Sequence, residues 1–179
     1  CSNALLQLGK APISSFEDPG DLARMCANLY PQERDSILRE HLWNCAIKRV
    51  VLAQDVTAPV SEFTYRYALP SDFVKVVRLN ECNSDEYRIE NGFLVTDEGT
   101  ATIEYVFLVT DETSFDPQFL DVFAQRLAAE ICYALTENNT LTEQCWRIYQ
   151  NKISMARTMD SRDGTPRDLE ANAWVFARF

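Results

Sequence analysis

The chain has 179 residues, with 27 acidic and 17 basic side chains and a formal net charge of −10. This length fits one domain, or one domain with an insertion, and allows a sizeable hydrophobic core. The acidic balance disfavours a protein that grips nucleic acid through its phosphates, and no apolar run approaches the roughly 20 residues of a membrane span. We therefore expect a soluble, acidic protein with a packed core and no membrane contact.

The first third of the chain has helical periodicity. Gly9 is expected to stop a short helix in the left-handed conformation, and Asp18-Pro19 has the acid-proline order of a helix start. Tyr30-Pro31 predicts a break, after which a long amphipathic helix is expected from about Gln32 to Ala53. Because the sequence opens at Cys1 without methionine or a basic signal peptide, we expect its true start to be missing.

The middle of the chain has the periodicity of strands. Between Val56 and Val109, apolar residues recur at every second position, which is typical of half-buried strands. Asn91-Gly92 carries the strongest signal available for a two-residue hairpin turn. We expect about four short antiparallel strands, forming a small sheet that must pack against another layer.

Helical signals return after the strands. Asp116-Pro117 predicts a capped helix start, and Thr140–Glu143 has the pattern of a capping box for a further helix. No regular pattern is visible from Ser161 to Phe179.

This order of elements predicts an α+β fold. We expect a bundle of about four to five helices built from residues 1–55 and 112–160, with a small antiparallel sheet inserted at residues 56–111. Residues 161–179 are expected to form an extended C-terminal arm.

The six cysteines favour reduced core thiols over disulfides or a zinc site. No C-x-x-C pair is present, so the usual zinc spacing is absent, and a well-cored chain does not need disulfide staples. We expect a reducing, cytosolic compartment and no bound metal. Four of the cysteines lie on apolar helical stripes, where a free thiol packs as a small hydrophobe: Cys26, Cys45, Cys132 and Cys145.

Catalytic chemistry has little support in the sequence. His41 is the only histidine, and a packing or surface role suits its place beside an apolar helical stripe better than catalysis does. No phosphate-cradling glycine loop, G-x-S-x-G or H-E-x-x-H motif is present. We predict no catalytic residue, no cofactor and no metal, and keep a small hydrolase using His41 only for comparison.

The negative charge is concentrated in residues 81–121, which hold eleven acids and a single base, Arg88. Three interpretations stay open: a solvated rim, calcium ligation without the usual D-x-D-x-D-G loop, and a surface that repels polyanions. The candidate acids are Glu81, Asp85, Glu86, Asp97, Glu98, Asp111 and Glu112.

The end of the chain is aromatic: Trp174, Phe176 and Phe179 lie within six residues. Exposed aromatic clusters usually mark a contact. These rings either dock onto the chain's own bundle or anchor the arm in a groove of a neighbouring subunit or partner. We favour the second hypothesis.

Several segments together resemble the head-to-tail adaptor proteins of short-tailed phages, the family of tail tubular protein A. Order and spacing carry this likeness, because none of the motifs is catalytic. The segments that resemble the family are Asn3–Ile13, the pair Cys26 and Tyr30, Arg34–Ala46, Tyr67–Phe73 with the pattern Y-x-L-P-x-D-F, Phe115–Phe119 and Arg126–Glu130.

The resemblance extends to about residue 156 and implies a structural virion protein, made in the host cytoplasm and located at the head-to-tail interface. Such proteins form a homo-dodecameric ring between the portal protein and a tail nozzle or tail tube protein. DNA passes through the lumen of the ring without specific binding.

On this basis, the seven candidate acids are expected at the lumen or rim of the ring. The three tail aromatics become candidates for contact with the portal or a neighbouring subunit, and Arg126 and Arg147 for inter-subunit salt bridges. The alternative is a monomeric tail-completion or assembly module that docks by its aromatic C-terminal tail.

Overall fold

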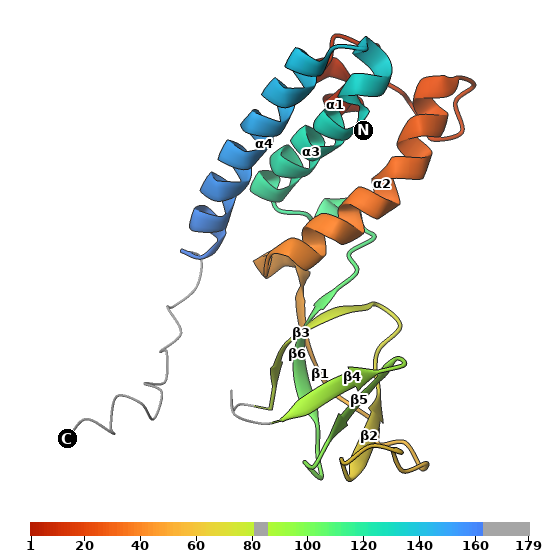
Figure 1. Ribbon diagram of the computed structural model, residues 1–179, viewed down its shortest axis with the longest axis vertical. Helices are drawn as coiled ribbons and strands as arrows, with labels where there is room; N and C mark the ends of the chain where they lie inside the picture. Colours follow the sequence, from red (N-terminus) through yellow and green to blue (C-terminus); the bar gives the residue numbers. More distant parts are fainter. Residues whose placement is uncertain (81–85, 163–179) are drawn as a thin grey trace, which may run out of the picture.

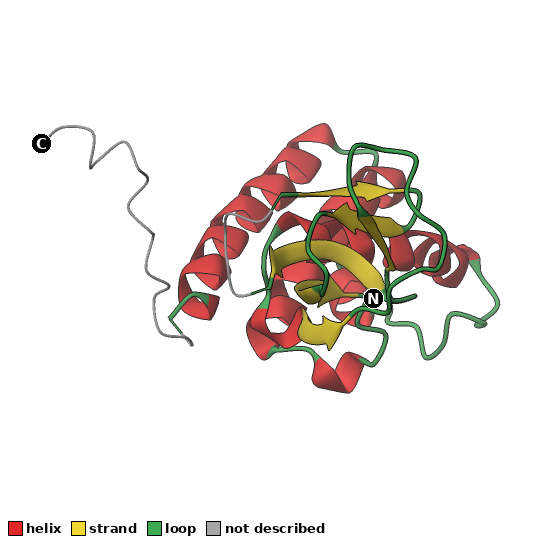
Figure 2. Ribbon diagram, turned by 90° about the horizontal axis from the view of Figure 1, so that it is seen from below, coloured by secondary structure: helices red, strands yellow, loops and turns green. Residues whose placement is uncertain are grey.

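The computed structural model describes residues 1–80 and 86–162. Helices and strands form two parts, stacked along the long axis of the molecule (Figure 1). Seen from below, along that axis, the strands lie over the helices rather than beside them (Figure 2). The predicted α+β class is confirmed.

The helical part is organised around one central helix, α3, whose buried face runs along most of its length. α3 packs against the other three α-helices of the described chain, because its apolar residues extend over more than one side. The α-helices are α1 (Ser2–Gln7), α2 (Asp21–Glu40), α3 (Pro117–Thr136) and α4 (Asn139–Asp160).

The course of α2 corrects three predictions. The helix begins at Asp21 with Gly20 as its N-cap, so the predicted start at Asp18-Pro19 is wrong, and it runs through Pro31 without a break. Proline removes one backbone hydrogen bond, but buried residues on both sides of it, among them Cys26 and Ile37, keep the helix packed against the core. The helix ends at Glu40, so the predicted continuation to Ala53 is wrong.

Residues Ile47–Val51 form strand β1 instead of the end of a helix. Each of these five residues has an antiparallel partner in β6, from Ile47 opposite Val106 to Val51 opposite Thr102. The sequence pattern is compatible with either structure, and a partner more than 50 residues away decides between them.

The described strands number six and form two three-stranded antiparallel sheets, where one small sheet of about four strands was predicted. One sheet has the order β1–β6–β3 and the other β2–β5–β4. A bridge between Gln54 and Tyr67 links the chain after β1 to β2, and the sheets share a core that includes Tyr67, Leu94 and Ile103. The strands are β1 (Ile47–Val51), β2 (Tyr65–Ala68), β3 (Phe73–Leu79), β4 (Tyr87–Glu90), β5 (Phe93–Thr96) and β6 (Thr102–Phe107).

Local turn and cap signals are mostly confirmed. Asn91 and Gly92 both have positive φ, 47° and 81°, as a two-residue hairpin turn requires. Asp116 caps α3 by accepting a hydrogen bond from the backbone N–H of Gln118. The cap of α4 differs from the prediction, because Asn138 rather than Thr140 accepts the capping hydrogen bond.

Trp43 fills the junction between the helical part and the sheets. Its side chain is 1% exposed, and its indole N–H donates to the carbonyl of Ile37 at the end of α2. Its ring packs edge-on against Phe119 of α3, with 5.1 Å between ring centres. Phe119 in turn contacts Phe115 and Phe123, so one aromatic cluster joins the end of α2 to the start of α3.

We expect Phe119→Ala to lower the free energy of unfolding by about 3–5 kcal/mol, because it opens a cavity in this cluster. Leu120→Ala is the matched control, since Leu120 is the next residue of the same helix and 41% exposed; its loss should be clearly smaller. Urea unfolding followed by circular dichroism measures both. Equal losses for the two variants would contradict the central place of Phe119.

Candidate interaction surfaces

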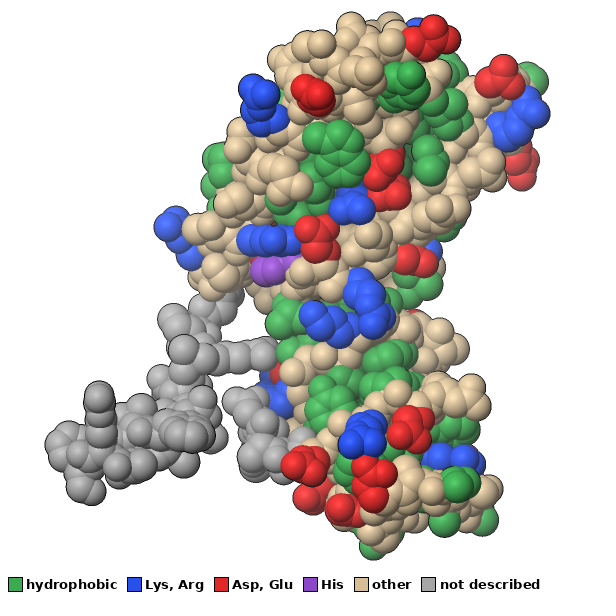
Figure 3. Space-filling model, viewed as in Figure 1, with side chains coloured by type: hydrophobic (Ala, Val, Ile, Leu, Met, Phe, Trp, Pro, Cys, Tyr) green, Lys and Arg blue, Asp and Glu red, His purple; other side chains and the backbone are tan. Residues whose placement is uncertain are grey.

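The single histidine lies where the end of α4 meets the start of the sheet part, and is seen in purple in Figure 3. His41 Nε2 is 3.2 Å from a carboxylate oxygen of Asp160, whose other oxygen accepts a hydrogen bond from the backbone N–H of Asn44. Burial lowers the pKa of His41 below its ordinary value, against the attraction of Asp160, which raises it. The cluster holds the end of α4 to the junction.

Within the two described ranges, no group of three histidine, cysteine, aspartate or glutamate side chains is placed to hold a metal ion. None of the helices in the same residues is both long and apolar enough to cross a membrane.

Asp72 joins the turn before β3 to two other strands. Its carboxylate accepts hydrogen bonds from Lys48 of β1 at 2.9 Å and from the hydroxyl of Tyr105 of β6 at 3.0 Å. Burial acts to raise the pKa of Asp72, but the hydrogen bonds from Lys48 and Tyr105 hold it below the ordinary value. Burial and the contact with Asp72 raise the pKa of Tyr105 to about 12.

Arg126 lies inside the helical part, where it joins three helices. Its guanidinium donates to Glu33 and Glu40 of α2 and to the hydroxyl of Tyr149 of α4. Burial acts to lower the pKa of Arg126, but its hydrogen bonds with Glu33 and Tyr149 raise it above the ordinary value. The charge of Arg126 is therefore paired within the chain, and a salt bridge to a neighbouring subunit is not needed to explain its position.

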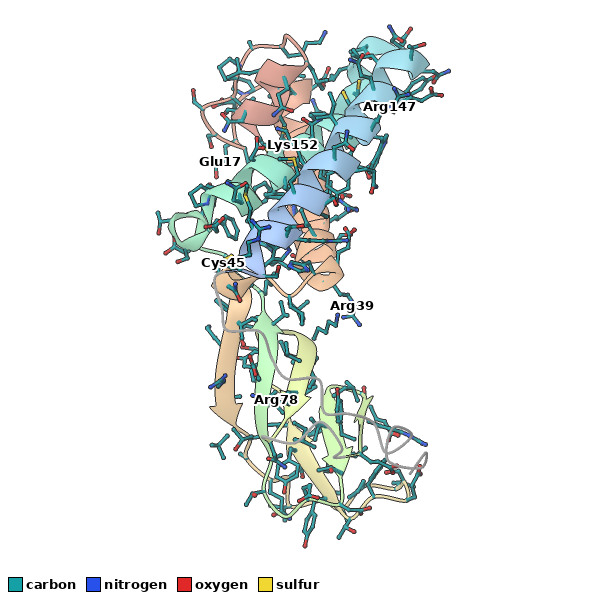
Figure 4. All side chains as sticks on the ribbon, turned by 90° about the vertical axis from the view of Figure 1, so that its left-hand side faces the viewer. Glu17, Arg39, Cys45, Arg78, Arg147 and Lys152 are labelled. Atoms are coloured by element: carbon teal, nitrogen blue, oxygen red, sulfur yellow. The ribbon has the colours of Figure 1, made fainter. Side chains whose placement is uncertain are left out.

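Arg147 has a different environment. It is exposed near the start of α4, at the end of the helical part farther from the sheets (Figure 4). No ion pair is found for it among the described residues. Of the two candidate arginines, Arg147 is therefore the one whose charge is available to a partner.

The candidate acids lie in two separate places. Glu86, Asp97 and Glu98 flank strands β4 and β5 of the sheet part, whereas Asp111 and Glu112 precede α3 beside the helices. Glu81 and Asp85 lie outside the described residues. The acidic run of the sequence is thus not one continuous surface.

The acids of the sheet part surround a depression. Glu62, Glu86 and Asp97 line it together with Arg88, and it encloses about 400 Å³. Acidic side chains gather on this lower part of the molecule in Figure 3. Arg88 pairs with Glu62 at 2.8 Å, so the depression keeps an excess of negative charge.

The two acids beside the helices have local structural partners. Asp111 accepts hydrogen bonds from the backbone N–H and the hydroxyl of Thr113. These hydrogen bonds hold the pKa of Asp111 below its ordinary value. Glu112 accepts a hydrogen bond of 2.6 Å from Tyr30 of α2.

One acid of the 81–121 segment is buried. Glu104 of β6 is 4% exposed and lies opposite Arg49 of β1 and Arg78 of β3 in the strand register. Arg78 contacts its carboxylate at 3.3 Å and Arg49 at 3.7 Å. Figure 4 shows Arg78 on the sheet part. Glu104 therefore contributes little to a repelling surface.

Sequence reasoning missed the loop between β1 and β2. Val56 and Val60 are fully exposed, and this loop lies at the end of the sheet part remote from the helices (Figure 1). The sequence did contain a signal for this loop: residues Val56 to Val60 are uncharged and mostly apolar, whereas a loop that only contacts solvent does not require apolar residues. We name residues 56–60 the tip loop.

The helical part also exposes apolar side chains. Ile148, Met155 and Met159 are exposed on α4, and their spacing places them along one side of the helix. A groove of about 270 Å³ lies elsewhere on this part, lined by Leu120 and Phe123 of α3 among others. The three aromatic residues predicted as contacts, Trp174, Phe176 and Phe179, lie outside the described residues.

No protein-family model matches the chain, and none of the curated proteins compared with it matches either.

We expect Arg126→Ala to lower the free energy of unfolding by about 3 kcal/mol, because it removes the partner of the Glu33 carboxylate, whose side chain is only 12% exposed. Arg147→Ala removes the same side chain from an exposed site and should change stability by less than about 0.5 kcal/mol. Chemical unfolding of both variants gives the comparison. Similar effects would contradict the internal role of Arg126.

Asp72 also gives a pH prediction. Because its pKa is lower in the folded chain, its contribution is present above its unfolded pKa, near 3.8, and is lost as pH falls below that value. Unfolding free energies at pH 5 and pH 3 should therefore differ less in Asp72→Asn than in the wild type. The exposed Asp21→Asn is the control and should keep the wild-type difference.

Proposed function

We propose that this protein is the adaptor subunit at the head-to-tail interface of a phage. In this role, copies of the chain form a ring between the portal protein and the tail nozzle or tail tube protein, and DNA passes through without specific binding. The sequence resemblance to tail tubular protein A motivates the proposal, including the expected twelve copies. The arrangement of exposed surfaces on the subunit supports it.

The observation that carries the proposal is the presence of exposed apolar side chains on both parts of an elongated subunit. The tip loop exposes Val56 and Val60 at the far end of the sheets, and α4 exposes Ile148 and Met155 in the helical part. Contiguous exposed apolar patches mark interaction sites, and we take the tip loop and this side of α4 as two candidates for such patches. A ring subunit placed between two partners needs both lateral and axial contacts.

The acids of the sheet part are the proposed lumen surface. Glu86, Asp97 and Glu98 share the sheet part, and two of them line its acidic depression. Repeated around a ring, this charge repels the phosphates of a passing DNA, so that the DNA slides without adhering. Arg147 is the proposed partner for an acid of the next subunit.

The test is negative-stain microscopy of the full chain mixed with its cognate portal protein, beside each protein alone. We expect ring-shaped density added to the tail-side face of the portal. Deleting residues 173–179 should leave the circular dichroism spectrum folded and reduce this association. Asp168→Asn/Glu170→Gln, a change of charge in the same arm, is the control and should associate as the wild type does.

A chain that stays monomeric and never associates with the portal would contradict the adaptor role and favour the monomeric assembly module. If the deletion variant associates with the portal as well as the wild type does, the tail aromatics do not form the portal contact. That result would not contradict the formation of a ring.

A further inference from the structure

Two buried thiols face each other between α3 and α4. The sulfur atoms of Cys132 and Cys145 are 3.9 Å apart, and the side chains are 0% and 7% exposed. The helices that carry them are consecutive and joined by a short connection around Asn138. The pair is therefore held together by the most extensive helix packing in the described chain, not by a loop.

The geometry needs little change to form a covalent bond. A disulfide has a sulfur–sulfur distance of about 2.05 Å, so the two sulfurs must approach by roughly 2 Å. Each thiol lies on a regular helix, so the approach has to come from rotation about the side-chain torsions and a small shift of the two helices. The other described cysteines, Cys1, Cys26 and Cys45, are likewise free thiols, and no sulfur–sulfur contact is found for them in this part of the chain.

The surroundings keep the pair reduced unless an oxidant reaches it. Apolar neighbours, among them Ala129 and Trp146, enclose the thiols. Burial, followed by the proximity of Cys132, raises the pKa of Cys145 to about 11. The reactive thiolate is therefore rare at neutral pH, and oxidation is slow there and faster at alkaline pH.

We propose that Cys132 and Cys145 are a cross-link site, which forms an intrachain disulfide when the folded protein meets a small-molecule disulfide such as oxidised glutathione. The thiolate of Cys145, the more exposed of the two, attacks one sulfur of the oxidant and releases one reduced glutathione. The thiolate of Cys132 then attacks Cys145 in the mixed disulfide and releases the second glutathione. The protein loses two electrons and two protons, and the oxidant becomes two glutathione thiols.

The cross-link would join the central helix to the helix that holds the junction. α4 ends at Asp160, which contacts His41 and Asn44 beside the sheets. Fixing α4 to α3 removes freedom from the unfolded chain and opposes detachment of α4. This inference is independent of the proposed adaptor role, and its test needs no portal protein.

The experiment oxidises the folded full chain with excess oxidised glutathione at alkaline pH, after complete reduction and removal of the reductant. Peptides are then mapped by mass spectrometry without reduction. We expect a cross-linked peptide pair that contains Cys132 and Cys145. We also expect a higher urea midpoint of unfolding, which returns to its starting value when the reductant is restored.

The controls separate this pair from the other cysteines. Cys145→Ala should abolish both the cross-link and the shift of the urea midpoint, whereas Cys26→Ala, which alters an equally buried cysteine on α2, should keep both. Recovery of Cys132 and Cys145 as free or glutathione-bound thiols in the wild type would overturn the proposal. Because this readout uses the wild-type chain, it does not depend on the folding of either variant.

Discussion

The antiparallel pairing of β1 with β6 is the constraint on which the rest of the structure depends. The chain leaves the helices through β1 and returns through β6, and five consecutive residue pairs align the two connections. This alignment brings the end of α2 close to the start of α3, where Trp43 and Phe119 pack together. The sheets are therefore attached to the helices by two paired strands, by this aromatic cluster and by direct hydrogen bonds such as that from Arg39 of α2 to the carbonyl of Val74 of β3.

Sequence reasoning succeeded at several places where structure depends on near neighbours, although two local start signals, Asp18-Pro19 and Thr140–Glu143, did not mark the observed caps. Asn91 and Gly92 tolerate the positive φ angles that the hairpin turn requires, and Asp116 followed by proline is a local signal for the start of α3. It failed at β1, because the strand exists only through its pairing with β6. It failed at Pro31 for a similar reason, since buried residues on either side stabilise the helix against the missing hydrogen bond.

The candidate surfaces likewise depend on residues that are far apart in the sequence, and sequence patterns alone could not predict them. Acids that are close in the sequence separate in space, because the chain returns to the helices between Glu98 and Asp111. The partners of Arg126 come from α2 and α4, and helical periodicity cannot reveal them. The sequence shows that the tip loop is apolar, but it does not show where in the molecule this loop lies. Only the fold puts them at one end of the molecule.

The position of Asp160 has a mechanical consequence. This residue ends α4 and is hydrogen bonded to Asn44 at the junction, so the last described residues lie near the middle of the molecule rather than at one of its ends. A pulling force applied to the end of α4 would therefore act first on the contacts of Asp160 with His41 and Asn44, before it reached the strand pairs of the sheets.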